Sequence, residues 1–306
     1  MNVVVSGATG LIGSALAARL ARGGHHVVRL VRRAARPGEA ALTWDPAAGS
    51  LDRAGLERVR CDAVVHLAGE NVFGRWTAAK KRRIRESRVT GTRLVSEAIA
   101  GLGRRPQVLL AASAVGYYGD RGAEELTERS PAGDDYLARV AREWEEATAP
   151  AARAGVRVVN LRFGVVLTPA GGALAKMLPA FRLGLGGPIA GGTQYVSWIA
   201  LDDVLDAIGH ALATHSLAGP VNVTAPHPVT SLELARTLGR VLRRPAVLPV
   251  PALALRLVFG VESAALLESG QRVLPERLLA SGFRFRFPEL EPALRRLLGP
   301  PEGSRV

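Results

Sequence analysis

The chain has 306 residues, of which 48% are hydrophobic and 22% are charged, so it can bury the core of one large domain, with or without an appendage. The single cysteine, Cys61, excludes an intrachain disulfide bond and suits a reducing cytoplasm. No secretion signal precedes the first predicted strand, and the longest apolar stretch, residues 246–261, is interrupted by two prolines and Arg256. We therefore expect a cytoplasmic protein without a membrane partner.

The net charge of +13 raises the question of a nucleic-acid partner. Only three of the 40 basic residues are lysines, and such an excess of arginine is typical of a coding bias. The densest basic run, residues 80–85, contains no aromatic residue and no nucleic-acid-binding motif, which indicates a solvated helix face. We expect no nucleic-acid partner. The six histidines show no metal-ligand spacing, so we also expect no metal site.

The first predicted element is a strand over residues 2–6, followed by a glycine-rich turn over residues 7–13 that opens a helix with an apolar face. Gly7 allows a turn at positive φ, Gly10 lets backbone N–H groups approach a phosphate, and Gly13 lets the helix pack closely on the strand. The free N–H groups and the dipole of the helix favour an anion. The unit is typical of a dinucleotide-binding site, with predicted contacts Gly7, Thr9, Gly10, Leu11, Ile12 and Gly13.

The second predicted strand, residues 26–31, ends at Arg32 and Arg33. An NAD-binding fold usually places Asp or Glu at this point to hold the ribose 2′-hydroxyl, and a carboxylate would repel a 2′-phosphate. A guanidinium instead binds a phosphate through paired, charge-assisted hydrogen bonds. The position therefore predicts NADP as the cofactor, the alternative being that both arginines are solvated surface residues.

Further apolar strands alternate with helices along the chain. We predict strands over residues 63–67, 108–112, 156–161 and 221–223, and helices over residues 77–102, 137–154 and 202–213. Continuous apolar strands separated by helices indicate a parallel sheet covered on both faces. The predicted fold class is α/β, with a doubly wound Rossmann-type sheet and a ligand across the carboxyl ends of its strands.

The character of the chain changes after residue 164. Residues 164–193 are rich in glycine and proline, with a short helical piece near residues 174–183, and could form a mobile cover over a site. Residues from 226 onward form helices and proline-punctuated connections. We predict an NADP-binding domain over residues 1–225, of which 164–195 contribute to the substrate lobe, and a smaller C-terminal lobe over residues 226–306.

Over its whole length the chain resembles the extended short-chain dehydrogenase/reductases, the superfamily of sugar-nucleotide epimerases and dehydratases. The resemblance rests on the glycine-rich turn, the strand ends at 67–69 and 162–164, and the pair Tyr118-Gly119. A subfamily of epimerase-like NADP-binding proteins is more similar still. The stretches that match it are residues 87–92, 113–119, 194–199, 202–203 and 273–278, the last in a C-terminal segment typical of that group.

The resemblance implies further site residues. Cofactor contacts are expected at strand ends and on the helix that follows the third strand, namely at Leu67, Ala68, Gly69, Glu70, Arg88, Ala112, Phe163 and Gly164. Substrate contacts are expected at Tyr117, Gln194, Ser197 and Trp198. Asp202 and Asp203 flank this pocket, although Asp is also a favoured N-cap, and we expect one of them to cap the helix that follows.

The chemistry of the superfamily needs a tyrosine that exchanges a proton with substrate, a lysine four residues later, and a Ser or Thr hydroxyl. Here the tyrosine is Tyr136, but Val140 stands at the lysine position, and Ala114 takes the hydroxyl position with Ser113 beside it. Three interpretations stay open. Tyr136 and Ser113 act, with Arg139 or Arg142 supplying positive potential; another group, Tyr117, Tyr118 or Glu70, transfers the proton; or no hydride chemistry occurs.

We therefore expect an NADP-dependent oxidoreductase or epimerase acting on a carbonyl or hydroxyl of a small polar substrate, with a sugar nucleotide among the candidates. The alternative is a non-catalytic NADP(H)-binding sensor or scaffold, which the residues Val140 and Ala114 favour. The resemblance also implies that a homodimer could form through the helices predicted at 77–102 and 137–154.

Overall fold

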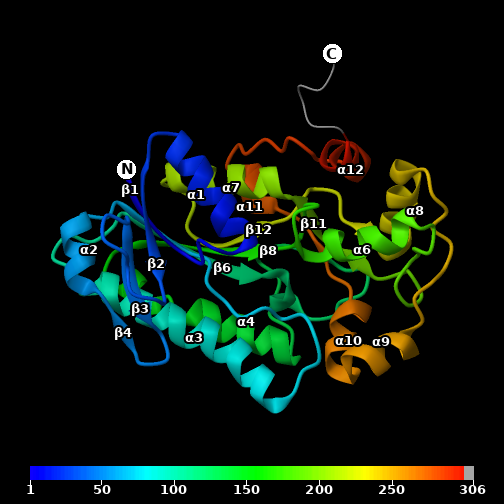
Figure 1. Cartoon of the computed structure of the whole chain (residues 1–306), viewed down its shortest axis with the longest axis horizontal. Helices are drawn as coiled ribbons and strands as arrows, with labels where there is room; N and C mark the ends of the chain where they lie inside the picture. Colours follow the sequence, from blue (N-terminus) through cyan, green and yellow to red (C-terminus); the bar gives the residue numbers. More distant parts are fainter. Residues whose placement is uncertain (300–306) are drawn as a thin grey trace.

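The computed structural model describes residues 1–299, without the side chains of residues 254, 258 and 259. Residues 300–306, the end of the predicted C-terminal lobe, lie outside the described residues. At the centre is an eight-stranded sheet with the order β12-β8-β6-β5-β1-β2-β3-β4 (Figure 1). Its strands are β1 (Asn2–Ser6), β2 (His26–Val31), β3 (Ala41–Asp45), β4 (Ser50–Leu51), β5 (Ala63–His66), β6 (Val108–Ala114), β8 (Arg157–Phe163) and β12 (Gly219–Val223). All neighbouring strands are parallel except β3 and β4.

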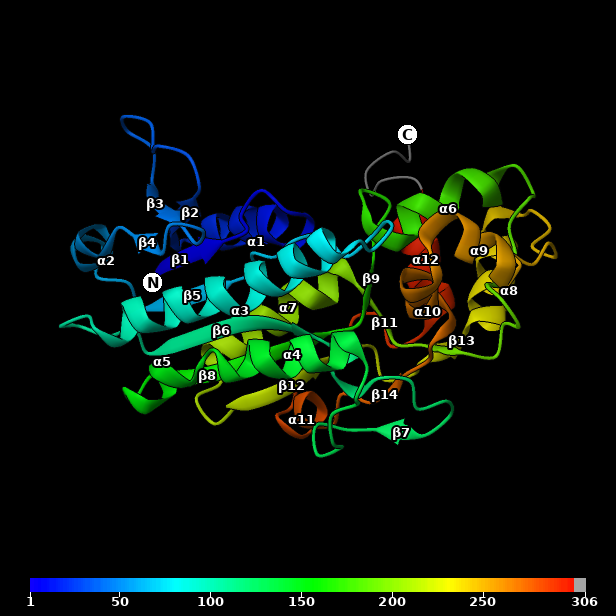
Figure 2. The same ribbon diagram turned by 90° about the horizontal axis from the view of Figure 1, so that it is seen from below.

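Helices cover both faces of this sheet (Figures 1 and 2). One face packs against α1 (Leu11–Arg22), α7 (Leu201–Ala213) and α11 (Glu276–Ala280), and the other against α2 (Arg53–Val59), α3 (Ala78–Ala100), α4 (Tyr136–Glu146) and α5 (Ala149–Arg153). Successive side chains of a strand point to opposite faces, so Val3 and Val5 join one buried cluster and Val4 joins the other. The predicted doubly wound α/β fold is confirmed.

The boundaries of two predicted helices need comment. The helix predicted over residues 77–102 is α3, whose N-cap Thr77 accepts a hydrogen bond from the backbone of Lys80. The prediction of a single helix over residues 137–154 is wrong, because the chain forms the two helices α4 and α5 there. Pro150 lies in the first turn of α5, where its missing N–H costs nothing, whereas inside one continuous helix it would remove a hydrogen bond.

A second group of helices lies beside the carboxyl ends of the strands (Figure 2). We call this group the C-terminal lobe. It consists of α6 (Gly172–Arg182), α8 (Ser231–Leu242), α9 (Ala252–Phe259), α10 (Val261–Glu268) and α12 (Leu290–Leu298). Buried side chains of α6, α8 and α12, among them Leu178, Leu238 and Leu294, form its core.

Short strands and one 3₁₀ turn complete the structure. The turn η1 (Val115–Tyr118) follows β6, and the short strands pair as β7 (Glu125–Leu126) with β14 (Arg272–Val273), β9 (Val165–Leu167) with β11 (Trp198–Ala200), and β10 (Tyr195–Val196) with β13 (Val229–Thr230). These pairings bring segments far apart in the sequence to the edge of the sheet where the parallel strands end.

The expectation that Asp202 or Asp203 caps a helix is wrong. The N-cap of α7 is Ala200, which offers no side-chain hydrogen bond, and both aspartates lie within the first turn. The buried carboxylate of Asp203 instead accepts hydrogen bonds from the backbone N–H groups of Arg286 (2.7 Å) and Phe287 (3.0 Å). It thereby ties the segment that leads to α12 onto α7.

Candidate functional site

The glycine-rich turn between β1 and α1 has the tight geometry expected of it. Gly7 has φ +66°, and a Cβ there would lie 2.8 Å from the carbonyl group of Leu67. A Cβ on Gly13 would overlap the carbonyl oxygen of Gly7, so only glycine lets α1 pack this closely on the turn. At Gly10 the nearest atom to an added Cβ is 3.2 Å away, and this residue is exposed. The backbone at Gly10 is therefore open to a ligand.

The N-terminus of α1 is free to bind an anion. Its N-cap is Gly10, which supplies no side-chain hydrogen bond, and its first turn contains no acidic residue. The first backbone N–H groups of a helix have no partner within the helix, and the helix dipole adds positive potential there. Thr9, Leu11 and Ile12 surround this N-terminus, and all three are exposed or half-buried. The cradle fits a pyrophosphate group.

Two buried polar side chains hold the ends of β1 and β5 together. The hydroxyl of Ser6 accepts hydrogen bonds from the backbone N–H groups of Leu67 (3.1 Å) and Ala68 (3.2 Å). It lies 2.7 Å from Nδ1 of His66, within hydrogen-bond distance. Burial lowers the pKa of His66 to about 4. No sequence motif predicts this pair, which sets the position of the Leu67-Ala68-Gly69 strand end.

The two arginines after β2 have different surroundings. Arg33 forms a bidentate ion pair with Glu39, at 2.6 and 2.8 Å. Arg32 is exposed, and no group within residues 1–299 forms a hydrogen bond or ion pair with its guanidinium. Of the two predicted 2′-phosphate ligands, Arg32 is therefore the one whose donors are available.

Arg88 and Glu70 meet at the end of β5. Nη1 of Arg88 donates to the backbone carbonyl of Glu70 at 2.9 Å, and its guanidinium lies 5.0 Å from the ring centroid of Trp144. Burial lowers the pKa of Arg88 to about 10. The Glu70 carboxylate is paired with Lys80 at 2.7 Å, which lowers its pKa and makes it a poor proton donor. Arg88 thus places positive charge directly beside Gly69.

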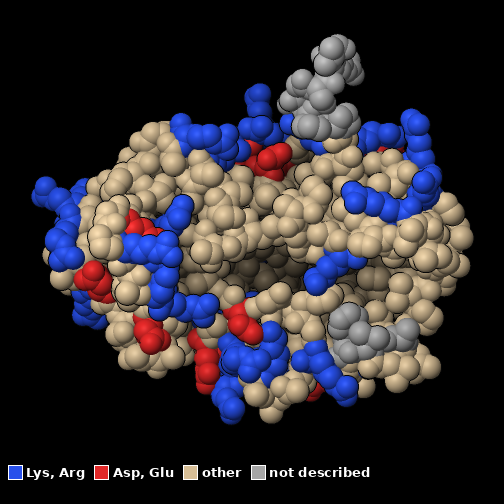
Figure 3. Space-filling view, in the orientation of Figure 1, with Lys and Arg blue, Asp and Glu red and all other residues tan. Residues whose placement is uncertain are grey.

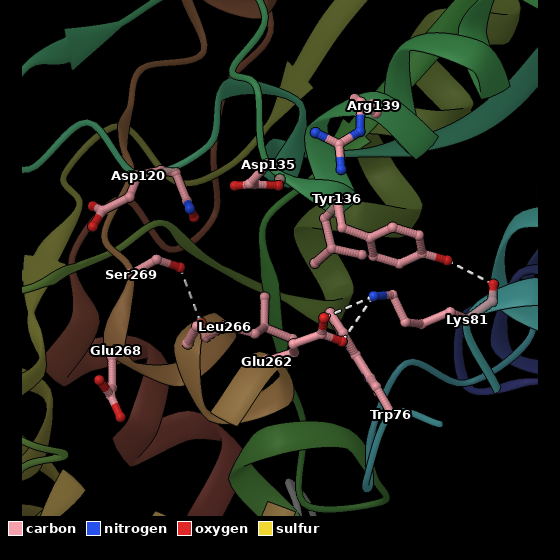
Figure 4. Close-up of a pocket in the computed structure, with 14 residues that line it drawn as sticks. Trp76, Lys81, Asp120, Asp135, Tyr136, Arg139, Glu262, Leu266, Glu268 and Ser269 are labelled. Atoms are coloured by element: carbon pink, nitrogen blue, oxygen red, sulfur yellow. Dashed lines mark hydrogen bonds and ion pairs between the residues drawn. The ribbon is translucent and has the colours of Figure 1, made fainter. Parts of the chain in front are cut away.

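A groove of about 610 Å³ lies between the N-terminal ends of α3 and α4 and the helix α10 (Figure 4). Its lining includes aromatic, apolar and charged side chains. They are Trp76, Lys81, Gly116, Asp120, Asp135, Tyr136, Leu137, Arg139, Glu262, Ala265, Leu266, Glu268, Ser269 and Gln271. The groove therefore joins the sheet domain to the C-terminal lobe, with the predicted catalytic tyrosine in its wall.

Tyr136 is half-buried at the start of α4, with its hydroxyl directed toward α3 (Figure 4). The hydroxyl donates to the backbone carbonyl of Lys81 at 2.6 Å, and the ring contacts Trp76 edge-on at 5.6 Å between centroids. Burial raises the pKa of Tyr136, and the positive charge of Arg88 opposes that increase. The phenol is therefore a proton donor in its resting state.

The lysine missing from α4 has a counterpart on another helix. Val140 is buried in the α3–α4 interface, so the usual position cannot carry a charge toward the groove. Nζ of Lys81, from α3, lies 4.9 Å from the Tyr136 ring centroid and is paired with Glu262 at 2.8 Å. The run 80–85 is thus only partly the solvated face that we expected, since Lys80, Lys81 and Arg85 all form ion pairs.

Ser113 belongs to a buried network and does not face the groove. Its hydroxyl donates to Glu145 at 2.7 Å, and Glu145 forms a bidentate pair with the buried Arg162. A buried charge pair is costly to disturb because each partner would lose its counter-charge. In this structure the Ser113 hydroxyl is therefore engaged in a network that supports the β6 and β8 strand ends, and its predicted catalytic role stays a prediction.

Three of the four predicted substrate contacts also have structural partners. Trp198 is fully buried, with Nε1 donating to the backbone of His227, so the prediction that it contacts substrate is corrected. The buried Ser197 hydroxyl bridges the backbones of Gln271 and Val273. The side-chain amide of Gln194 donates to the carbonyls of Ile189 and Leu267. Ser197 and Gln194 thus tie down segments near the groove instead of reaching into it.

The aromatic pair of η1 divides into a buried and a half-buried residue. The Tyr118 hydroxyl donates to Asn222 at 2.7 Å, and burial raises its pKa to about 12, which disfavours it as an alternative proton-transfer group. Tyr117 is half-buried, with the Arg162 guanidinium 3.5 Å from its ring centroid. Of the two alternative tyrosines, Tyr117 is therefore the more accessible.

The remaining predicted cofactor residues lie at strand ends. Ala112 is buried in β6, and Phe163 is half-buried at the end of β8. A Cβ on Gly164 would overlap the carbonyl oxygen of Ser197, so this glycine serves the close approach of β9 and β11. In the face shown in Figure 3, the surface is hollowed between the sheet domain and the C-terminal lobe, and the floor of the hollow is formed by uncharged residues.

Several groove residues were missed at the sequence level. No spacing rule identifies Trp76, Lys81, Asp120 or Glu262 as site residues. Glu262 is separated from its partner Lys81 by 181 residues in sequence. Within residues 1–299 no three His, Cys, Asp or Glu side chains are arranged to hold a metal ion. No helix of that part of the chain is long and apolar enough to span a bilayer.

Comparisons with known proteins agree with this architecture. The model of the NAD dependent epimerase/dehydratase family matches residues 3–223, and that of a domain of unknown function (DUF1731) matches residues 250–297. An epimerase family protein of Mycobacterium bovis is 44% identical over 95% of this chain and 96% of its own length.

Two solved structures are similar over nearly the whole chain. The human epimerase family protein SDR39U1, crystallised with NADPH, is 37% identical with a TM-score of 0.88, covering 97% of this chain and 99% of the human one. A nucleoside-diphosphate sugar epimerase from Corynebacterium glutamicum is 38% identical with a TM-score of 0.79, covering 98% of this chain and 58% of the other. The matched family model spans most of this sequence, so the chain belongs to the NAD dependent epimerase/dehydratase family.

Proposed function

We propose that this chain binds NADP(H) across the carboxyl ends of its strands and exchanges hydride with a carbonyl or hydroxyl carbon of a small polar substrate. The observation that carries the proposal is the uncapped α1 N-terminus together with the guanidinium of Arg32, which has no partner in the described part of the chain. The human relative crystallised with NADPH supports it. A sugar nucleotide, the substrate class named for the Corynebacterium relative, is one candidate.

Different residues of the candidate site then bind different parts of the cofactor. The backbone N–H groups at residues 10–13 bind the pyrophosphate, and Arg32 binds the 2′-phosphate. Leu67, Ala68 and Gly69, held by Ser6, line the ribose on the nicotinamide side, with Arg88 behind them. When bound, the cofactor supplies the hydride or its acceptor. Residues 1–225 would form the cofactor-binding domain, and the C-terminal lobe would close the substrate side.

Tyr136 donates or accepts the proton that accompanies hydride transfer. Its hydroxyl exchanges the hydrogen bond to the Lys81 carbonyl for one to the substrate oxygen. Arg88 and Lys81, both from α3, place positive charge near the phenol in the way that the superfamily lysine does from α4. Tyr117 is the proposed substrate contact on the opposite side, since its ring is held by Arg162.

The test combines binding with turnover. We expect NADPH to bind to the purified protein, as measured by the change in its fluorescence. A panel of aldehydes, ketones and sugar nucleotides is then screened for loss of NADPH absorbance, and Tyr136→Phe is expected to abolish any turnover while leaving NADPH binding intact. Turnover that persists unchanged in Tyr136→Phe would contradict the role of this tyrosine.

A second candidate function is a non-catalytic NADP(H)-binding protein. The buried Val140 at the lysine position and the locked Ser113 hydroxyl favour it. Tight NADPH binding with no turnover of any panel member would support this candidate over the first.

A further inference from the structure

The groove beside Tyr136 contains more carboxylates than cations. Four carboxylates line it, those of Asp120, Asp135, Glu262 and Glu268, against the two cations Lys81 and Arg139. We infer that the substrate bound in this groove is an uncharged hydroxylated carbonyl compound, not a nucleoside diphosphate sugar. This inference rests on the proposed function and specifies its substrate.

A diphosphate needs more free donors than the groove offers. Proteins bind phosphates through arginine or lysine side chains with free donors, or through uncapped helix N-termini. Lys81 is already neutralised by Glu262, which it meets at 2.8 and 2.9 Å. Arg139 is exposed, lies apart from the Lys81–Glu262 pair in Figure 4, and donates through Nη1 to the backbone carbonyl of Asp134. Lys81 is thus neutralised by its partner, and Arg139 is left as a single cation against the carboxylates of the groove.

Of the three helix N-termini at the groove, those of α4 and α10 carry carboxylates, whereas that of α3 is capped by the Thr77 hydroxyl. Asp135 caps α4 by accepting a hydrogen bond from the backbone of Ala138 at 2.8 Å. Glu262 lies in the first turn of α10. Asp135 occupies the place that a phosphate would take at a helix N-terminus, and the negative charge of both carboxylates would repel an approaching phosphate.

The remaining carboxylates add to this repulsion. Oδ1 of Asp120 accepts a hydrogen bond from the backbone N–H of Gly270 at 3.1 Å, and Glu268 is paired with Arg256 at 2.7 Å. Their oxygens keep lone pairs for hydroxyl donors, because a carboxylate can accept about four hydrogen bonds. Hydroxyl groups of an uncharged substrate can donate to them without any charge repulsion.

Apolar and aromatic surface completes the recognition. Trp76 and Tyr136 meet edge-on at one side of the groove, and Leu137 and Leu266 lie across from them. Such surface suits the C–H faces of a short carbon chain or sugar ring. The combination of carboxylate acceptors with aromatic rings matches a hydroxylated compound better than a diphosphate.

The test compares matched ligands on the protein loaded with NADP⁺. Binding of UDP-glucose is measured by calorimetry, and binding of D-glyceraldehyde and L-erythrulose by saturation-transfer NMR. We expect the two uncharged compounds to bind and UDP-glucose to bind with a Kd weaker than about 1 mM. Leu266→Trp, which fills the groove, should remove binding of the uncharged compounds without changing NADPH affinity.

A charge variant provides the second arm. Glu262→Gln releases the Lys81 ammonium and should tighten UDP-glucose binding at least about ten-fold. Glu291→Gln on α12, which is paired with Arg240 and Arg295 far from the groove, changes the net charge equally and should have no such effect.

Three outcomes distinguish a failure of the inferred substrate class from a failure of the proposed function. UDP-glucose binding to the wild type with a Kd below about 1 mM would overturn the inference while leaving the proposed function intact. Absence of binding by either uncharged compound would also overturn it. Failure of the protein to bind NADPH, measured first on the same sample, would overturn the proposed function itself.

Discussion

The two parts of the candidate site, the α1 N-terminus and the groove beside Tyr136, differ in how they interact with negative charge. At the α1 end the helix N-terminus is uncapped, its first turn has no acidic residue, and no group of residues 1–299 pairs with Arg32. At the groove end the helices α4 and α10 begin with Asp135 and Glu262, and the nearest lysine is neutralised. One end is built for phosphate groups and the other for a ligand without them. The comparison separates cofactor recognition, which follows a general rule of helix termini, from substrate recognition, which depends on side chains particular to this chain.

The strongest way to break the α1 end is to add a methyl group at Gly13. In Gly13→Ala the new Cβ would overlap the Gly7 carbonyl oxygen, so α1 must move away from the turn. We expect a loss of about 3 kcal/mol or more in the free energy of unfolding, and at least a 100-fold weaker affinity for NADPH. Denaturant unfolding and NADPH titration measure these two quantities.

The control is Gly209→Ala, also within a helix, where an added Cβ has no neighbour within 4 Å. That variant should be neutral or slightly stabilising. Equal effects of the two substitutions would mean that close packing at the turn is not what Gly13 provides.

Acid should destabilise the folded protein through His66, at the end of β5. Its pKa is about 4 in the folded protein, below the ordinary 6.5, so the unfolded chain binds more protons between these values. Folding stability is therefore greatest above pH 6.5 and decreases as the pH falls toward 4, by roughly 3 kcal/mol from this group. Carboxyl groups titrate near the lower end of this pH range, so the informative quantity is the difference in the free energy of unfolding between the wild type and His66→Gln at each pH. A wild type and a His66→Gln variant with parallel stability profiles over this range would refute the assignment.

The preference for the 2′-phosphate should depend on one of two adjacent arginines. Arg32→Asp is expected to weaken NADPH relative to NADH at least ten-fold, because a paired guanidinium–phosphate contact contributes on the order of 1.5–3 kcal/mol. Arg33→Asp should change the ratio less, because the Arg33 guanidinium is already bound to Glu39. Parallel titrations with both cofactors give the ratio, and an unchanged ratio in Arg32→Asp would remove Arg32 from the site.

The smallest expected effect concerns the charge near the phenol. The guanidinium of Arg88 lowers the pKa of Tyr136, so Arg88→Gln should raise it, whereas Arg88→Lys should retain the wild-type value. Titration of the ¹³Cζ resonance of Tyr136 follows the phenol directly. An identical titration in the glutamine variant would show that Arg88 does not lower the pKa of Tyr136.

The same contrast explains what sequence reasoning could predict. The turn at residues 7–13 and the position of Arg32 follow from local chemistry, since each depends on residues adjacent in the chain. The fold followed from alternating apolar strands and helices for the same reason. Even the break between α4 and α5 had a local signal, in Pro150, that the helical pattern obscured.

The groove could not be predicted in this way. Tyr136 and Lys81 are 55 residues apart, and the four-residue spacing rule tests only for a lysine on the same helix. Motif resemblance pointed to Ser197 and Trp198 without showing that both side chains are buried. The hydrogen bond of Ser113 to Glu145, which is paired with Arg162, joins residues that are distant from Ser113 in sequence. Burial and long-range ion pairs decide these roles, and neither can be read from one sequence.

The most direct test of the central claim is calorimetric titration of the wild-type protein with NADPH and with NADH. Amides at an uncapped helix N-terminus together with the free guanidinium of Arg32 predict that NADPH binds, and that it binds at least about ten-fold more tightly than NADH. Equal affinity for the two cofactors, or no heat of binding with either, would contradict the account.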